Sequence, residues 1–364
     1  MKRLAALLAL VLGSVLAACG GSVDESTQAP ARAEAVFVAR AAGIGGPLTG
    51  YDARLARLFS LPPGIRAADG SGYFAVQDGR LLRFDPRTGV KSRTYALQGD
   101  WTLGGVSANG AWVALTRPGT EVVVLDTRAG KVTDRISLRG HFTVETVSSE
   151  GDFLFLQQNF VDGSYAVRGY DLAANQMLPG SLATKGETLL MQGLATQTVA
   201  SPDGRWLLTL YVNTASNTAF VHALNLIDRV PLCILMPPCK RCGTEDLARW
   251  SLALGPDGRT LFAANPAAGR VAEIHLPSAR VIDDARFRPA RGTASYAAVA
   301  PDGSQLLFTN GETVWAYDTH RGFASELHSQ PGIVELGFST DGRVFAARKD
   351  APPFALELQV ADSN

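Results

Sequence analysis

The sequence is poor in the residues that carry most catalytic and metal chemistry. Its 364 residues include 4 cysteines, 5 histidines and 19% charged side chains. It has no G-x-S-x-G, Walker-type phosphate-loop or H-E-x-x-H motif, and its histidines have no paired spacing. These absences disfavour the enzyme classes that depend on such motifs. We therefore predict no catalytic residue, no metal ion and no cofactor.

Charge of either sign is not in excess, and no apolar run is long enough to span a bilayer. The chain carries 34 basic and 34 acidic residues, which gives no electrostatic footprint for nucleic acid. Its longest apolar run, Leu4 to Ala18, is shorter than the roughly 20 residues that a membrane helix needs. Because Lys2 and Arg3 precede this run, we predict a signal peptide over residues 1–18.

The signal peptide ends in a motif with its own chemistry. Leu16-Ala17-Ala18-Cys19 resembles a bacterial lipobox, which implies lipidation of Cys19 by palmitate-type acyl chains after cleavage. The alternative is an ordinary signal peptide with an incidental cysteine. Residues 19–35, which contain Gly, Ser, Pro and mixed charge with no apolar period, are expected to form a flexible tether. We predict a cell-envelope lipoprotein, anchored on the extracytoplasmic side of a membrane through this lipid alone.

One short phrase recurs along the rest of the chain. Seven copies of a turn that ends in glycine lie 39 to 54 residues apart, with "SPDG", "GPDG" and "APDG" as the clearest. Gly supplies positive φ at the last turn position, while Asp, Asn and Ser bond back to the backbone. Each copy is followed by an apolar strand-like run and then by a second turn, usually at Asp, as in "VVVLDTRAG".

The repeat predicts four short strands per unit, designated a to d. That spacing is typical of propeller blades. "SPDGRWLLTLYV" and "VVVLDTRAGKVTDRISL" resemble the YVTN/TolB-like, or WD40-like, propeller repeat of secreted bacterial proteins. The resemblance implies one all-β domain over residues 36–361 with four-stranded antiparallel blades. It implies no single function, because this fold carries enzymes and binding modules alike.

Seven glycine turns favour seven blades, and eight blades is the alternative. Residues 36–61 contain strands b, c and d, whereas residues 332–361 contain a, b and c. We expect the N-terminal d-strand, 55–61, to pair with the C-terminal set, because that arrangement hides both sheet edges.

Sequence spacing selects one face of the propeller as functional. The b–c and d–a connections lie on one face of a blade, and both are longest in the two blades that contain Gly151 and Gly204. Long loops on a rigid scaffold often carry function, and neutral loop growth is the alternative. The candidate ligand or partner residues are Gln158, Asn159, Tyr165, Asn213, Asn217, Lys240, Arg241 and Glu245.

The remaining cysteines fall within one segment. Cys233, Cys239 and Cys242 predict one disulfide in an oxidising envelope, either Cys239–Cys242 or Cys233–Cys242, with Cys233 best suited to be the buried leftover thiol. Zinc lacks a fourth ligand here. A redox-active C-x-x-C would need a helix N-terminus, which we do not expect in an all-β blade.

Two function classes remain open. The first is a monomeric binding or scaffold module for a protein, peptide or glycan partner, acting through the b–c/d–a face. The second is an extracytoplasmic propeller enzyme of the lactonase, hydrolase or lyase type, with its site at that face or at the channel mouth. Glu145 and Glu335, in two predicted a-strands, are the carboxylates that favour the enzyme. We prefer the binding module, because the other a-strands are mostly small and apolar.

Overall fold

The computed structural model describes residues 33–40, 47–117, 121–182, 190–339, 341–349 and 351–357. The predicted signal peptide, Cys19 and the tether as far as residue 32 lie outside the described residues. In the described part of the chain, no helix has the length and hydropathy needed to cross a membrane.

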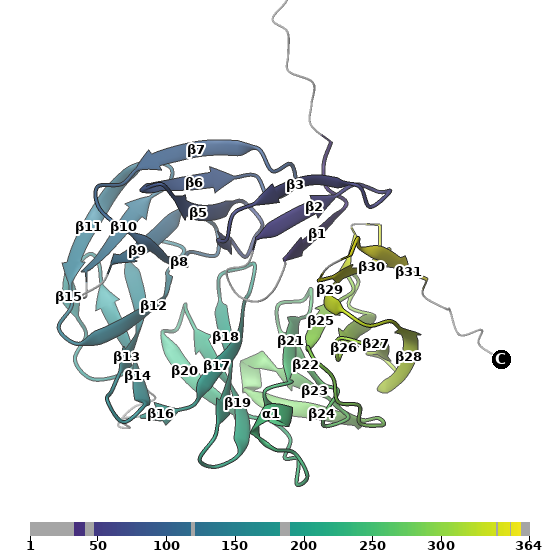
Figure 1. The fold of residues 1–364 in the computed structure, drawn as a ribbon. Helices are drawn as coiled ribbons and strands as arrows, with labels where there is room; N and C mark the ends of the chain where they lie inside the picture. Colours follow the sequence, from purple (N-terminus) through teal and green to yellow (C-terminus); the bar gives the residue numbers. More distant parts are fainter. Residues whose placement is uncertain are drawn as a thin grey trace, which may run out of the picture. The chain divides into compact units, whose positions relative to one another are not determined.

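The described residues form eight antiparallel sheets in chain order, which we number as blades 1 to 8 (Figure 1). The strands of blades 1 to 4 are β1 Phe37–Arg40, β2 Leu48–Tyr51 and β3 Arg57–Leu61; β4 Ile65–Arg66, β5 Tyr73–Gln77, β6 Arg80–Phe84 and β7 Lys91–Ala96; β8 Thr102–Val106, β9 Trp112–Arg117, β10 Glu121–Asp126 and β11 Lys131–Ser137; and β12 His141–Val147, β13 Phe153–Asn159, β14 Ser164–Asp171, β15 Gln176–Met177 and β16 Met191–Gln192.

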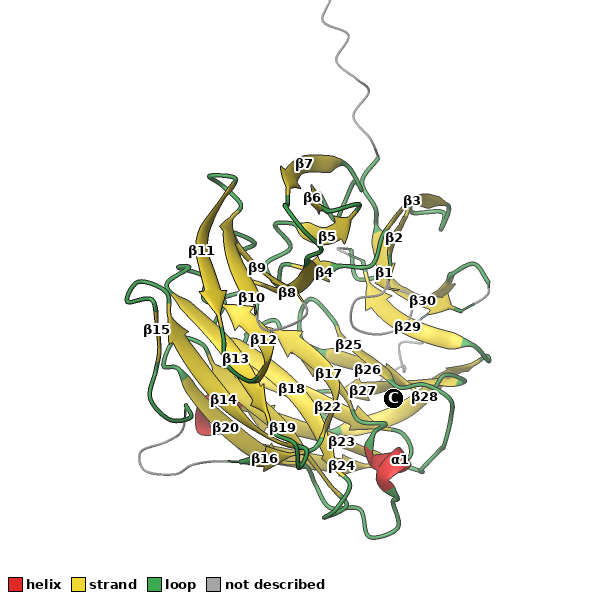
Figure 2. Cartoon of the chain, turned by 60° about the vertical axis from the view of Figure 1, so that its left-hand side comes forward, coloured by secondary structure: helices red, strands yellow, loops and turns green. Residues whose placement is uncertain are grey.

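Blades 5 to 8 continue the pattern, and strands make up nearly all of the regular structure (Figure 2). Their strands are β17 Leu194–Ala200, β18 Trp206–Asn213, β19 Thr218–Asn225 and β20 Val230–Leu235; β21 Ser251–Leu254, β22 Thr260–Asn265, β23 Arg270–His275 and β24 Arg280–Arg286; β25 Tyr296–Val299, β26 Gln305–Thr309, β27 Thr313–Asp318 and β28 Phe323–Ser329; and β29 Ile333–Phe338, β30 Val344–Arg348 and β31 Phe354–Leu356. Two short helices lie between strands, α1 Thr244–Leu247 and the 3₁₀ helix η1 Leu276–Ser278.

Successive blades pack through their inner strands. Strand β8 contacts β12, β17 contacts β21, β21 contacts β25, and β25 contacts β29. The ring closes where β1 of blade 1 contacts β29 of blade 8 (Figure 1). The predicted all-β propeller of antiparallel blades is therefore confirmed.

The preferred count of seven blades is wrong, and the alternative of eight is confirmed. Strand β3 pairs with β2 in blade 1 and does not join the C-terminal sheet, β29-β30-β31. Blades 1 and 8 meet instead through side chains, with the Phe37 and Phe345 rings stacked at 5.0 Å between centroids. Packing of large aromatic faces covers the ends of the ring, so hydrogen bonding between the two partial sheets is not needed to close it.

The repeated turns have the backbone angles and the Asp hydrogen bonds that the sequence predicts. The seven turn glycines all have positive φ, from 62° at Gly110 to 81° at Gly342. At the second turn, Asp126 Oδ1 accepts hydrogen bonds from the backbone N–H groups of Arg128 and Ala129 at 2.8 and 2.9 Å. Because the same pattern returns in successive blades, local turn chemistry sets where each strand begins and ends.

The core lies between adjacent blades, and the middle strands are buried on both faces. In β18, Trp206, Leu208 and Leu210 belong to the cluster shared with blade 6, whereas Leu207 and Tyr211 belong to the cluster shared with blade 4. Burial on both faces explains why this strand is a continuous apolar run.

Blades 4 and 5 differ from the others in strand length more than in loop length. Strands β14, β18 and β19 each have 8 residues, whereas β5 and β6 in blade 2 have 5. The b–c turns that join the long strands span only 160–163 and 214–217. The expected long b–c loops are therefore longer hairpins, because the additional residues continue the ladder of backbone hydrogen bonds.

The d–a connection between blades 5 and 6 contains the helix that sequence reasoning did not expect. Helix α1 begins at Thr244, two residues after Cys242. The expectation that no helix N-terminus lies near the C-x-x-C was wrong, because the connection is long enough to form one helical turn.

Candidate functional site

The long connections of blades 4 and 5 meet on one side of these blades. Ser164 and Tyr165, just after the b–c turn of blade 4, pair with Gln192 and Met191 of the following d–a connection. In blade 5, Asn217 Nδ2 in the b–c turn donates a hydrogen bond of 3.0 Å to the carbonyl oxygen of Cys242. The strand order used to choose this face therefore brings b–c and d–a connections together.

A disulfide closes the tip of the blade 5 to blade 6 connection. Cys239 and Cys242 are bonded, with their Cα atoms 5.4 Å apart, so one of the two predicted pairings is confirmed and Cys233–Cys242 is excluded. Among the cysteines that the structure describes, Cys233 is the free one, as predicted, but the residue is exposed rather than buried. It lies on β20, the outer strand of blade 5, where the residue keeps access to solvent although its Sγ lies 3.6 Å from Met191 Sδ.

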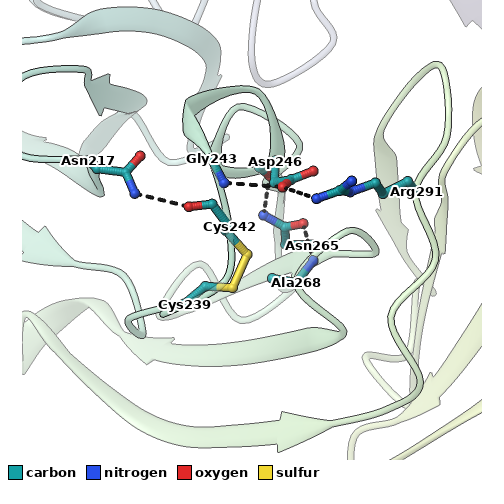
Figure 3. A network of polar contacts seen from close by, with 8 residues as sticks. All are labelled: Asn217, Cys239, Cys242, Gly243, Asp246, Asn265, Ala268 and Arg291. Atoms are coloured by element: carbon teal, nitrogen blue, oxygen red, sulfur yellow. Dashed lines mark hydrogen bonds and ion pairs between the residues drawn. A yellow bond between two sulfur atoms is a disulfide. The ribbon is translucent and has the colours of Figure 1, made fainter.

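Helix α1 is fixed by polar contacts at both ends (Figure 3). Asp246 Oδ2 accepts hydrogen bonds from Gly243 N at 3.1 Å and from Arg291 Nη2 at 2.9 Å. The carbonyl oxygen of Asp246 accepts a hydrogen bond of 2.9 Å from Asn265 Nδ2, on blade 6. Because these partners come from three segments, the disulfide-closed loop has a fixed position on the surface.

An open pocket lies beside α1, lined by Gly243, Thr244, Glu245, Asp246 and Arg291. Glu245 is exposed, as are Lys240 and Arg241 between the bonded cysteines. The rim of this pocket therefore offers charges of both signs on a fixed backbone. Such a surface suits polar recognition of a partner better than the binding of one small anion.

Several of the predicted candidates make contacts within their own blades. Gln158 Oε1 accepts a hydrogen bond of 2.6 Å from Arg168, Asn159 Nδ2 donates to Thr143 Oγ1 at 3.1 Å, and Asn213 Oδ1 accepts from Ala215 N at 3.0 Å. Tyr165 is only 2% exposed. These side chains help to shape the hairpins of the two blades. The candidates Asn217, Lys240, Arg241 and Glu245 are exposed.

Sequence reasoning missed several exposed apolar side chains on blades 4 and 5 and on the connection between them. Val161 is fully exposed, and Leu194 and Leu235 are each 67% exposed. Phe160 and Leu190 are 39% and 54% exposed. We call these five residues the apolar edge. The only sequence signal was that apolar residues interrupt segments that otherwise read as polar loops.

Strand pairing relates only some members of the apolar edge to one another, because it places residues 191 and 192 beside the start of β14. Leu190 and Leu194 flank the β16 segment, whose Met191 pairs with Tyr165, two residues after the b–c turn. Cys233, two residues before Leu235, donates a hydrogen bond from Sγ to Met191 Sδ at 3.6 Å. Because alternate residues of a strand face the same way, Leu235 lies on the Cys233 side of β20.

A buried aromatic cluster lies beneath this edge. The ring centroids of Tyr165 and Tyr211 are 4.9 Å apart, and the His222 ring lies 6.1 Å from Tyr211. Tyr211 donates a hydrogen bond of 2.8 Å to Gln157 Oε1. Burial lowers the pKa of His222 to about 4, and its Nε2 has no hydrogen-bond partner.

Glu145 and Glu335, the two carboxylates in predicted a-strands, lie in different surroundings. Burial raises the pKa of Glu145 to about 7. Glu335 is 7% exposed and its Oε1 accepts a hydrogen bond of 2.9 Å from Tyr296. Within the described ranges, no three His, Cys, Asp or Glu residues are grouped so that they could hold a metal ion. The arrangement gives no specific support to the enzyme hypothesis.

Fold and surface together define the class of an eight-bladed β-propeller. The chain matches no protein-family model, and no curated protein matches it. Among solved structures it is similar to hydrazine synthase from Kuenenia stuttgartiensis, with a TM-score of 0.45 and 15% identity over 81% of this chain and 94% of that one.

A second similar structure is a functionally unknown protein from Desulfotomaculum acetoxidans DSM 771. It has a TM-score of 0.46 and 14% identity, over 76% of this chain and 89% of that one. Likenesses at such identity concern the fold alone, and no activity follows from them.

Proposed function

We propose that the protein is an extracytoplasmic, lipid-anchored scaffold that binds a protein partner through the apolar edge of blades 4 and 5. The motif evidence for a YVTN/TolB-like lipoprotein supports the family and the location. The observation that carries the binding function is the exposure of several Val and Leu side chains on blades 4 and 5.

The chemistry of the surface favours a protein or peptide over a glycan. Val161, Leu194 and Leu235 are aliphatic and more than half exposed, so a partner that covers them gains hydrophobic free energy, about 25 cal/mol for each Å² of apolar area. Lys240, Arg241 and Glu245 supply charged groups in the next connection. An apolar centre with a polar rim is the usual composition of a protein interface.

The tether supports the same proposal. With lipid on Cys19, residues 19–35 place the propeller on the order of 20 Å from the membrane. A partner at that height is another envelope protein or a peptide segment of one. The enzyme alternative receives no comparable support, because its carboxylates lack a shared site.

The test compares variants of equally exposed apolar residues at different places. Leu194→Asp and Leu235→Asp change the apolar edge, whereas Ile282→Asp and Phe323→Asp change residues that are 59% and 66% exposed on blades 6 and 7. A photo-crosslinking residue at position 161 in intact cells should give a discrete adduct. We expect the first pair of variants to remove that adduct and the second pair to retain it.

Two outcomes would contradict the proposal. If no adduct forms at position 161, or if the Ile282→Asp and Phe323→Asp variants lose it equally, the apolar edge is not a specific docking surface. The location is tested separately with Cys19→Ser, which should move the protein out of the acylated membrane fraction. Failure of that second test alone would leave the docking surface intact.

A further inference from the structure

Two sulfur atoms from different blades approach each other at the apolar edge. Cys233 lies on β20 of blade 5, and Met191 lies on β16, which pairs with β14 of blade 4. Their Sγ and Sδ atoms are 3.6 Å apart. The two residues are separated by 42 positions in the chain, so this contact is a product of blade packing.

A buried imidazole lies next to the sulfur pair. His222 on β19 is the direct register partner of Cys233 on β20, and directly opposed residues in a sheet place their side chains on the same face. His222 is 5% exposed, and its Nε2 has no hydrogen-bond partner. Buried polar atoms without partners are uncommon in folded proteins and point to an unfilled role.

We propose that Cys233, Met191 and His222 form a binding site for copper(I). Thiolate, thioether and imidazole are the ligand types that select this soft ion over magnesium, calcium or manganese. With metal–sulfur distances of roughly 2.3 Å, two sulfur atoms 3.6 Å apart can bind one ion between them. Zinc is not expected, because its protein sites use Cys, His and carboxylate ligands and are usually four-coordinate.

Binding at this site involves no redox step. The Cys233 thiol loses its proton to water as the copper–sulfur bond forms, and the copper remains in the +1 state. The Met191 thioether and the neutral His222 ring bind through lone pairs without proton release. Exposure of Cys233 gives the ion an entry path, whereas Tyr165 and Tyr211 enclose the His222 side.

The site is separate from the disulfide loop and from the docking function proposed above. Cys239 and Cys242 are bonded to each other and are not available as ligands. Copper binding also needs no partner protein. The inference therefore stands or falls independently of whether the apolar edge docks an envelope protein.

Silver(I) is the best first probe, because it has the same ligand preference and needs no reductant that would open the disulfide. The full chain with Cys19→Ser is the common background, so that Cys233 is the free thiol. We expect one Ag⁺ per chain by calorimetry. Cys233→Ser should abolish this binding, and Met191→Leu and His222→Gln should each weaken it at least about tenfold. Met177→Leu and His275→Gln are matched controls that should leave it unchanged.

A measurement on the unmutated binding residues guards against variants that fail to fold. With methyl-labelled methionine, one of the 4 methionine signals should shift on addition of one equivalent of Ag⁺. Copper(I), supplied anaerobically as its acetonitrile complex, should displace the silver, and a tenfold excess of Zn²⁺ should not. Ag⁺ binding that blocks the thiol without shifting a methionine signal would overturn the proposal. Wild-type affinity in both Met191→Leu and His222→Gln, or displacement by Zn²⁺, would overturn it as well.

Discussion

The buried carboxyl of Glu145 should lower the free energy of unfolding by an amount that depends on pH. Glu145 is the residue at the register shift of strand β12, between Val144 and Thr146, and burial raises its pKa from 4.5 to about 7. A carboxyl with a raised pKa in the folded state stabilises the fold only while it is protonated. Its ionisation therefore costs stability as the pH rises from about 4.5 through 7.

The substitution Glu145→Gln removes this cost while keeping the size of the side chain. A rise from 4.5 to about 7 sets an upper limit of about 3.5 kcal/mol, at about 1.4 kcal/mol for each pKa unit. Because Glu145 retains intermediate exposure, water reduces this figure, and we expect a gain of about 1–2 kcal/mol at pH 8. At pH 4.5 the wild-type carboxyl is mostly protonated in the fold, so the gain should nearly vanish.

Urea unfolding of both proteins at pH 4.5 and pH 8 measures the effect. The comparison between variants at one pH cancels the contributions of all other titrating groups, including His222. Glu326→Gln, at an exposed position on β28, is the matched control and should change the free energy of unfolding by less than about 0.5 kcal/mol at either pH. Equal effects of Glu145→Gln at both pH values would refute the reasoning.

Two further predictions concern the turns and the cysteines. Gly151 has φ of 74°, and a Cβ there would lie 2.0 Å from Trp112 Cε2, whereas Gly342 has φ of 81° and no atom within 4 Å of such a Cβ. Gly342→Ala should therefore cost about 1–2 kcal/mol for the left-handed backbone, and Gly151→Ala about 1–3 kcal/mol more for overpacking, measured by urea unfolding; equal costs would refute the steric argument. In the acylated protein, denatured but not reduced, thiol titration should find one thiol, Cys233, and three after reduction; three thiols before reduction would contradict the disulfide.

The repeat in the sequence was sufficient to predict the strands, because each boundary is set by local chemistry. Glycine at positive φ and Asp that bonds its own backbone act within four residues of the chain. The same locality explains why one disulfide within this segment could be predicted. The choice between Cys239–Cys242 and Cys233–Cys242 stayed open until the structure showed the first.

The number of blades and the way in which the ring closes could not be predicted from local sequence patterns. They depend on whether the partial sheets at the two chain ends join by hydrogen bonds or pack through side chains. The Phe37–Phe345 stack, formed by residues from opposite ends of the chain, made the second arrangement the one adopted. No local pattern distinguishes these cases.

The candidate surface was also predicted from the sequence only in part. Spacing alone indicated blades 4 and 5 and the face where their connections meet, because repeat lengths can be counted. Only the tertiary structure decided that Tyr165 is buried, that Val161, Leu194 and Leu235 are exposed, and that Cys233 lies against Met191. Exposure and contact between distant residues arise from how neighbouring sheets pack, and packing is a property of the assembled blades rather than of any one segment.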